Sequence, residues 1–277
     1  MSSGKKTITI EELQALRKMR DDYRASRAAV TSASMPDSAN RSQTKKATDE
    51  DSSKPVVTAQ RGDQDSDYSD IISRQSVKSG LPDSYEPSVR ELRGYLAKWN
   101  TLNVYVEHEA ALEMLFRGDP EFSRNTSLRH IIVKCAVLND FYATNIYQIE
   151  PVARNIASIR DFDRRLERGD LSLVGEIAKA DKVKNFNYSF ATKYCSHHKP
   201  ELFPIYDRYV ADVLMFLRRK YPEIFKFRSR ENLKDYDTFV EAIETVRQNF
   251  GLEDYSYKDI DRYLWQLGKE FYNPYVK

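Results

Sequence analysis

The sequence predicts an all-α fold, with a single helical domain over residues 89–277 after an N-terminal region, residues 1–88, that is largely disordered. From Pro87 onward, apolar residues recur at intervals of three and four, which is the spacing of one helix face. No run alternates between apolar and polar residues for long enough to indicate a sheet, and the chain has no internal repeat. These three observations predict one helical domain.

The N-terminal region differs from the rest of the chain in composition. Residues 28–88 are rich in Ser, Thr, Asp, Lys, Gln and Pro and poor in large apolar side chains. Such a segment buries too little surface to offset the entropy that is lost on ordering. We expect a disordered tether or tail there, preceded by a short helix near residues 10–27.

The helices of the domain are predicted from apolar periodicity and from capping residues at their ends. Asn125-Thr126-Ser127 precedes a strongly apolar segment, Asp170 precedes another, and Gly251 follows a third. The expected helices are residues 89–100, 104–117, 128–142, 149–159, 171–180, 189–198, 208–221, 239–250 and 258–271.

Composition and charge exclude several classes of protein. The formal net charge of +2 argues against a polybasic protein, so nucleic-acid binding needs a local basic face. The two cysteines, Cys135 and Cys195, are too few for a disulfide framework, a four-cysteine zinc site or an iron–sulfur cluster, and they are typical of a reducing cytosol. No apolar run is long enough to span a membrane, and the N-terminus lacks the apolar stretch of a signal peptide. We therefore expect a cytoplasmic protein without a membrane partner or a cofactor.

Residues 189–210 are the most informative segment of the chain. Pro204 restricts the residue before it to an extended conformation, and Asp207 then stands at the N-cap position of a helix with apolar residues on one face. A carboxylate at that position is held ionised by the helix dipole and the unpaired N–H groups. Asp207 is thus a structural cap or the carboxylate of an active site, and the residue pattern leaves both interpretations open.

A family resemblance bears on this choice. The run Pro204-Ile205-Tyr206-Asp207-Arg208-Tyr209-Val210 resembles the Pro-Val-Asp-Thr-His-Val segment of the helix–hairpin–helix DNA glycosylase superfamily. In that family the aspartate caps a helix and serves as the essential carboxylate, a role that falls on Asp207 here. A weaker match lies at residues 138–146, which are similar to the turn through which the family feeds a side chain into DNA. Asn139 and Thr144 are the nearest polar matches there.

The chain departs from the family pattern at the hairpin. The glycine-rich turn of the family is replaced by Lys184-Asn185-Phe186-Asn187-Tyr188-Ser189, which has no glycine. The family's lyase lysine falls on Ser189, as in members that hydrolyse the base without a Schiff base. Lys193 lies one turn further along the same helix face and remains a candidate amine nucleophile. The four-cysteine cluster of some members is absent from the sequence.

The resemblance implies a divergent, monofunctional DNA glycosylase that flips a damaged or modified base out of double-stranded DNA. Asp207 would stabilise the positive charge that grows on the sugar and help to activate water. One hypothesis is that the base is a bulky modification of the kind found in phage DNA, which would make the protein a defence factor. The residues that we expect at the catalytic site are Asp207, Ser189 and Lys193. Those expected to bind substrate or DNA are Asn139, Tyr142, Thr144, Lys184, Tyr188, His198, Arg208, Arg218 and Arg219.

Other interpretations remain. A non-catalytic helical module that binds nucleic acid or protein would use Asp207 only as a cap, and a helical nuclease would need converging metal-binding carboxylates that the sequence does not show. His197 and His198 diverge by about 100° on a helix and have no second ligand cluster, so we expect no metal and place them at a solvated helix end. The basic run from Arg218 to Arg230 fits a DNA-backbone contact or an ordinary helix C-terminus equally well.

Overall fold

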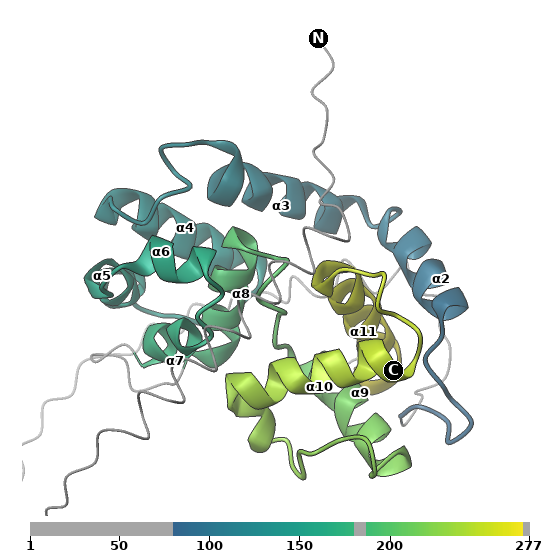
Figure 1. Cartoon of the computed structure of the whole chain (residues 1–277). Helices are drawn as coiled ribbons and strands as arrows, with labels where there is room; N and C mark the ends of the chain where they lie inside the picture. The colour runs from purple at the N-terminus through teal and green to yellow at the C-terminus, as the bar shows by residue number, and fades with distance from the viewer. Residues whose placement is uncertain (1–79, 180–186, 274–277) are drawn as a thin grey trace, which may run out of the picture.

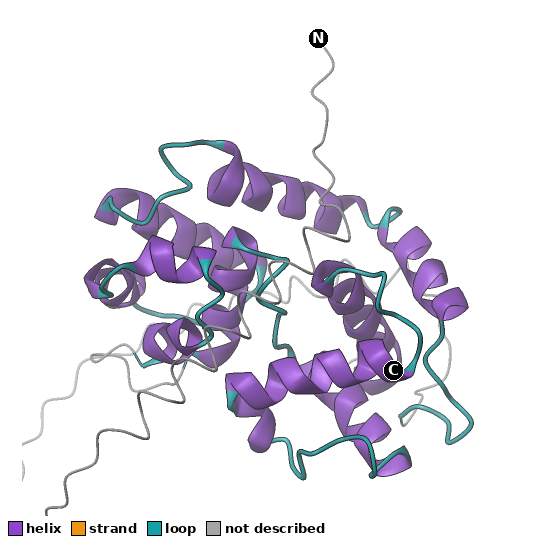
Figure 2. Cartoon of the chain, viewed as in Figure 1, coloured by secondary structure: helices purple, strands orange, loops and turns teal. Residues whose placement is uncertain are grey.

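The computed structural model describes residues 80–179 and 187–273, and this part of the chain is helical without any strand (Figures 1 and 2). The short helix expected near residues 10–27 lies outside these residues. The helices are α2 (Val89–Trp99), α3 (Asn103–Glu113), α4 (Leu128–Phe141), α5 (Ile149–Ser158), α6 (Phe162–Glu167), α7 (Ser172–Ala178), α8 (Tyr188–His198), α9 (Arg208–Lys220), α10 (Tyr236–Asn249) and α11 (Tyr257–Tyr272).

The predicted all-α fold is confirmed, and each helix expected from residue 89 onward is present with ends that differ by a few residues. The expected helix at 104–117 is α3 followed by a π-helical turn, Met114–Gly118. The sequence did not predict α6, which has six residues and follows Asp161 in a left-handed conformation (φ 55°). Six residues are too few for apolar periodicity to be recognised.

The residues that the structure describes begin at residue 80, before the predicted domain boundary at residue 89. Leu81 and Tyr85 belong to the hydrophobic core. The N–H of Gly80 donates to the carbonyl of Phe271 at 3.1 Å, and the ring of Tyr85 packs on Phe216 of α9. Residues 80–88 are polar in composition, but their two large apolar side chains are enough to anchor them against the last helices.

The helices lie in two groups, which Figure 1 shows side by side. Helices α4 to α8 form one group, and α2, α9, α10 and α11 form the other, so that the first described helix packs on the last. Helix α3 runs along both groups, and residues 199–207 carry the chain from α8 to α9. Buried side chains from both groups form one continuous hydrophobic core.

The crossing of α9 and α11 depends on a glycine. A Cβ atom placed on Gly268 would lie 2.5 Å from the carbonyl oxygen of Tyr209 and 2.7 Å from its carbonyl carbon. Helix backbones approach so closely only where one of them lacks a side chain. Because Tyr209 is the second residue of α9, the glycine holds α11 against the N-terminal end of α9.

Candidate functional site

Lys193, Ser189 and Asp207 lie together where the two groups of helices join. Lys193 is in α8, one turn after Ser189, and Asp207 precedes the first residue of α9. The Nζ atom of Lys193 donates to Oγ of Ser189 at 2.6 Å and to the carbonyl oxygen of Tyr206 at 3.3 Å. It lies 3.9 Å from Oδ2 of Asp207. The three residues assigned to catalysis from the sequence therefore share one site.

The two carboxylate oxygens of Asp207 have different surroundings. Oδ1 accepts a hydrogen bond of 2.8 Å from the N–H of Tyr209, which confirms that Asp207 is the N-cap of α9. Oδ2 faces the amine of Lys193, and the side chain is 24% exposed. One carboxylate can thus cap a helix and still present an oxygen to a reacting group, so the two interpretations of the sequence do not exclude each other.

The amine of Lys193 is almost completely enclosed, with 3% of its side chain exposed. Burial lowers the pKa of Lys193, and the negative charges of Asp207 and Asp261 oppose that shift. A lysine with a lowered pKa has a larger neutral fraction near neutral pH, which is the form that acts as a base or a nucleophile.

Tyr142 covers Lys193 from the C-terminal end of α4. The Nζ atom of Lys193 lies 5.1 Å from the centroid of the Tyr142 ring, which is a cation–π distance. The Tyr142 hydroxyl lies 2.9 Å from Nε2 of His197, and the residue is 36% exposed. Burial lowers the pKa of His197 to about 3, with the charges of Arg117 and Lys193 adding to the effect, so the imidazole is neutral. The ring of Tyr142 therefore lies between the enclosed amine and solvent.

Asp261 is a carboxylate near this site that the sequence did not reveal, and its charge acts on Lys193. It lies in α11, and its Oδ1 is buried without a hydrogen-bond partner among the described residues. Burial, reinforced by the charge of Asp207, raises the pKa of Asp261 to about 7, although the charges of Lys193, Lys258 and Arg262 oppose the shift. The available signal was its spacing, four residues after Tyr257 and three before Leu264, which places a carboxylate next to the buried residues of α11.

Two basic side chains of α11 border Asp261 and are held by α3. Lys258 and Arg262 both form ion pairs with Glu109, the second of them at 2.5 Å. Glu109 also accepts from the indole N–H of Trp99 at 3.3 Å. The carboxylate of Glu109 thereby fixes two cations beside Asp261, and it ties α3 to α11.

Asn139 and Thr144 shape the turn that follows α4. The Oδ1 atom of Asn139 accepts from the Thr144 hydroxyl at 2.7 Å and from the N–H of Ile146 at 2.9 Å. Ala143 and Asn145 have positive φ angles of 45° and 58°. The two polar residues that we expected to contact DNA are therefore engaged with the turn itself. The turn presents Tyr147, which is 91% exposed and was not singled out from the sequence.

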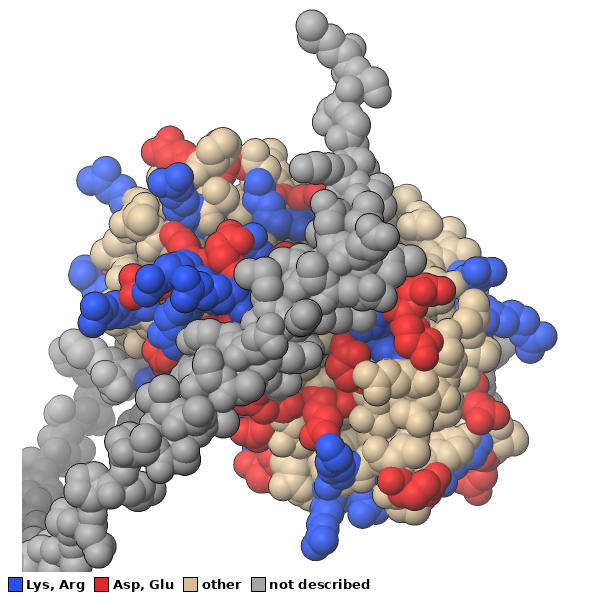
Figure 3. All heavy atoms as spheres, viewed as in Figure 1, with Lys and Arg blue, Asp and Glu red and all other residues tan. Residues whose placement is uncertain are grey.

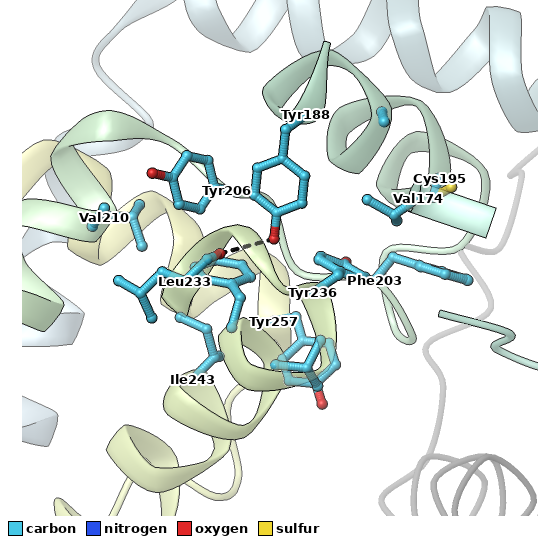
Figure 4. Close-up of a cluster of buried hydrophobic side chains, with 14 of the residues drawn as sticks. Val174, Tyr188, Cys195, Phe203, Tyr206, Val210, Leu233, Tyr236, Ile243 and Tyr257 are labelled. Carbon is cyan, nitrogen blue, oxygen red and sulfur yellow. Dashed lines mark hydrogen bonds between the residues drawn. The ribbon is translucent and has the colours of Figure 1, made fainter. Parts of the chain in front are cut away.

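Tyr188, which the sequence suggested for substrate binding, is buried in the core beside this site. Its ring is buried against Tyr206 and Tyr236, and its hydroxyl donates to the carbonyl of Leu233 at 2.9 Å (Figure 4). The residue is 5% exposed. The structure gives Tyr188 a packing role and leaves it no surface for a base.

His198 is also buried, which corrects the expectation of a solvated helix end for His197 and His198. Nε2 of His198 lies 3.3 Å from both Nζ of Lys134 and Nδ2 of Asn125, so it accepts a hydrogen bond. Oδ1 of Asn125 accepts from Lys134 at 2.8 Å and from the Tyr194 hydroxyl at 2.6 Å. This satisfied network joins α4 to α8, because buried polar groups require partners. It leaves His198 no contact with a phosphate.

The basic residues that we expected to contact DNA do not lie together in the structure. Arg208 is exposed next to Asp207, with its guanidinium 4.9 Å from the centroid of the Tyr209 ring. Arg218 donates to the carbonyl of Phe227 at 3.2 Å, and Arg219 is exposed at the far end of α9, about 18 Å along the helix from Asp207. Lys184 lies outside the described residues. On the face in Figure 3, basic side chains gather over the α5 and α6 side and acidic ones over the α10 side.

Neither a metal site nor a membrane span is found in the described ranges. No three His, Cys, Asp or Glu side chains of residues 80–179 and 187–273 are arranged to hold a metal ion. Within the same ranges, no helix has both the length and the apolar character that crossing a membrane requires.

Comparisons with known proteins point to one family. The family model HI_0787_N, described as an N-terminal domain, matches residues 91–202, which include Ser189 and Lys193 and end before Asp207. An uncharacterized protein of Haemophilus influenzae is 42% identical over 151 residues, which are 53% of this chain and 71% of that protein. No solved structure matches the chain.

Proposed function

The chain belongs to one family with the Haemophilus influenzae protein. We propose that it is a DNA glycosylase with Asp207 as its essential carboxylate. The single observation that carries this proposal is the position of Oδ2 of Asp207, 3.9 Å from the enclosed amine of Lys193, while Oδ1 caps α9. The partner is double-stranded DNA with a damaged or modified base, and the expected setting is the cytoplasm.

The carboxylate suits the chemistry of glycosidic bond cleavage. As the bond between sugar and base breaks, positive charge develops on the sugar, and a fixed anion nearby lowers the energy of that state. The N-cap bond from Tyr209 holds Asp207 in place before the substrate arrives. Preorganisation of this kind is what makes a charge effective, since no reorientation is needed during the reaction.

Tyr142 and Tyr147 supply the aromatic surfaces that the reaction needs. A base that leaves the duplex loses stacking and is held by an aromatic face instead, for about 1–3 kcal/mol per ring. Tyr142 is 36% exposed above Lys193, whereas Tyr147 is 91% exposed on the turn after it. In this proposal the ring of Tyr142 stacks on the flipped base, and the ring of Tyr147 fills the gap that the base leaves in the duplex.

Lys193 favours a covalent variant of the same function. Its amine is enclosed beside Asp207, and its pKa is lowered by burial. A neutral amine in this place can attack C1′ of the sugar as the bond to the base breaks, with one proton of the amine passing to the departing base. Cleavage of the C1′–O4′ bond, with a proton added to O4′, then gives the Schiff base. Borohydride separates the two routes, because it traps a protein–DNA adduct only when Lys193 is the nucleophile.

The proposal is tested by base release from DNA. Purified full-length protein is incubated with phage DNA that carries hypermodified bases, with duplexes that carry damaged bases, and with plain DNA, and abasic sites are counted. We expect abasic sites on a modified substrate and none on plain DNA. Asp212→Asn is the matched control, since Asp212 lies in the same helix and pairs with Arg230. Absence of abasic sites on every substrate would favour a non-catalytic binding module.

A further inference from the structure

The amine of Lys193 is enclosed, although any reaction at this amine requires access to it. The Lys193 side chain is 3% exposed. The groups around Nζ are the Ser189 hydroxyl at 2.6 Å, the Tyr206 carbonyl at 3.3 Å, Oδ2 of Asp207 at 3.9 Å and the centroid of the Tyr142 ring at 5.1 Å. An amine with so little exposed surface cannot meet a substrate until one of these groups moves.

Three of the four groups are held by helix α8 or by the start of α9. Ser189 lies one turn before the amine in α8 itself. The N–H of Tyr206 donates to the hydroxyl of Thr192 at 3.1 Å, which ties the chain before α9 to α8. Asp207 caps α9 through its bond from the N–H of Tyr209. None of the three can uncover the amine without disturbing one of these two helices.

Tyr142 is held less firmly than the other three groups. It follows the last residue of α4, and the next residue, Ala143, has a φ angle of 45°. Tyr142 is 36% exposed, and within the described residues its hydroxyl has one hydrogen bond, to Nε2 of His197 at 2.9 Å. A rotation of this side chain towards solvent therefore breaks one side-chain bond and leaves the backbone bonds of α4 in place.

His197 is a fixed partner for the Tyr142 hydroxyl. Ser189, Lys193 and His197 follow one another at intervals of four residues in α8, so they lie on one face of the helix. The Tyr142 ring lies over this face, with its centroid 5.6 Å from that of the imidazole. His197 is 3% exposed and packs on the ring of Phe116 at 5.5 Å. The imidazole therefore keeps its position when Tyr142 moves.

We propose that Tyr142 is a lid over the amine of Lys193 and that its hydrogen bond to His197 holds the lid shut. In the closed form, which the structure shows, the ring covers the amine. In the open form the side chain of Tyr142 has rotated towards solvent, and the amine is accessible. His197 is then a positioning residue, which acts on the amine through Tyr142. The use of the open form in base release rests on the proposed function, whereas the lid itself does not.

The test is the rate at which the amine is labelled in the full-length protein without DNA. Formaldehyde and dimethylamine–borane methylate accessible lysines, and mass spectrometry of peptides gives the rate at each site. Lys134 is the internal reference, because it is 0% exposed and is bonded to Asn125 in the same group of helices. Labelling of Lys134 reports a general loosening of the domain, which the lid does not require.

Variants at Tyr142 test the cover itself. Tyr142→Phe loses the bond to His197 and should raise the labelling rate of Lys193 by about fivefold, the factor that corresponds to one hydrogen bond. Tyr142→Ala removes the ring and should raise the rate further. Tyr95→Phe is the matched control, since it loses a hydroxyl bond to Glu270 elsewhere in the domain and should leave the rate unchanged. An unchanged rate in both Tyr142 variants would overturn the lid, as would a rise at Lys193 that Lys134 matches.

Variants at His197 test the bond that holds the lid shut. His197→Leu removes the acceptor and should speed the labelling of Lys193 as Tyr142→Phe does. His197→Gln supplies an amide in its place and should restore slow labelling. Equal labelling of Lys193 in wild type and a folded His197→Leu protein would overturn the part assigned to His197. Absence of base release in every protein, with the labelling rates as expected, would overturn only the glycosylase proposal.

Discussion

Lys193 donates a hydrogen bond to Ser189 one turn earlier in α8, and this bond fixes the amine beside Asp207. The Ser189 hydroxyl in turn donates to the carbonyl of Tyr206 at 3.1 Å, the residue before Asp207. A small polar side chain thus joins the helix that carries the amine to the segment that carries the carboxylate. Ser189 acts here through Lys193, which differs from the direct part in catalysis that its alignment with a lyase lysine suggested.

Ser189→Ala should therefore loosen the amine without removing it. The variant loses both hydrogen bonds of the Ser189 hydroxyl, for about 1–3 kcal/mol of unfolding free energy, while the bond from Lys193 to the Tyr206 carbonyl remains. We expect single-turnover base release to fall about tenfold, because one such bond corresponds to roughly that factor. A loss as large as that of Asp207→Asn would show instead that Ser189 takes part in the chemistry. Urea denaturation gives the stability of each variant.

Tyr142 should contribute through its ring more than through its hydroxyl. Tyr142→Phe keeps the ring above Lys193 and loses the contact with His197, whereas Tyr142→Ala removes the stacking surface. We expect Tyr142→Ala to weaken binding of DNA with a modified base by about 1–3 kcal/mol and Tyr142→Phe to weaken it much less. Fluorescence anisotropy with modified and plain duplexes measures both. If both variants lose the same binding free energy for modified DNA, Tyr142 acts through its hydroxyl and not through its ring.

The crossing at Gly268 should not tolerate a methyl group. In Gly268→Ala the new Cβ would meet the Tyr209 carbonyl at 2.5 Å, so α9 and α11 must move apart. We expect a loss of about 1–3 kcal/mol of unfolding free energy, accompanied by lower activity, because Tyr209 also donates to Asp207.

Gly94→Ala provides the control for this substitution. Gly94 lies inside α2, where a Cβ would have no neighbour within 4 Å. Alanine there should stabilise the protein by up to about 1 kcal/mol, since glycine is the poorer helix former. Thermal unfolding of both variants measures the contrast, and a stable Gly268→Ala protein would refute the close crossing.

The buried histidine pair should make the protein sensitive to acid. The pKa of His197 is about 3 in the folded state and near 6.5 when unfolded. Between these values the unfolded chain binds more protons than the folded chain, so stability falls as the pH decreases from 6.5 towards 3. His197→Gln removes the contribution of this imidazole. In the variant, the unfolding free energy that is lost between pH 6.5 and pH 3 should be smaller than in wild type by at most about 5 kcal/mol. His198, whose pKa is also lowered by burial, should account for part of the loss that remains. An identical acid profile in wild type and His197→Gln would contradict the burial of a neutral imidazole.

Local features of the sequence predicted much of the fold. Apolar spacing located the longer helices, and the position of Asp207 before an amphipathic segment predicted its cap. Short or polar segments were missed, among them α6 and the packed residues around Tyr85, because neither contains enough periodic apolar residues to be recognised. These errors share a cause, since tertiary contacts rather than local pattern order such segments.

The site could be predicted only in part. The spacing between Ser189 and Lys193 places them on one helix face, and proximity to Asp207 followed from the family resemblance. Asp261 lies more than fifty residues further along the chain, and its charge acts on Lys193 only because α11 packs against α9 in the folded protein. His198 and Tyr188 illustrate the opposite error, because polar and aromatic residues near a motif can be buried in the core with their hydrogen bonds satisfied.

The most direct measurement compares base release by wild type and Asp207→Asn on the same modified DNA, under single-turnover conditions and with unfolding followed in parallel. Asparagine is a good N-cap, so the variant should keep its stability to within about 1 kcal/mol. The account predicts that base release falls by at least about a hundredfold, while Asp212→Asn remains as active as wild type. Base release at the wild-type rate by a folded Asp207→Asn protein would contradict the account, because Asp207 would then be a cap and nothing more.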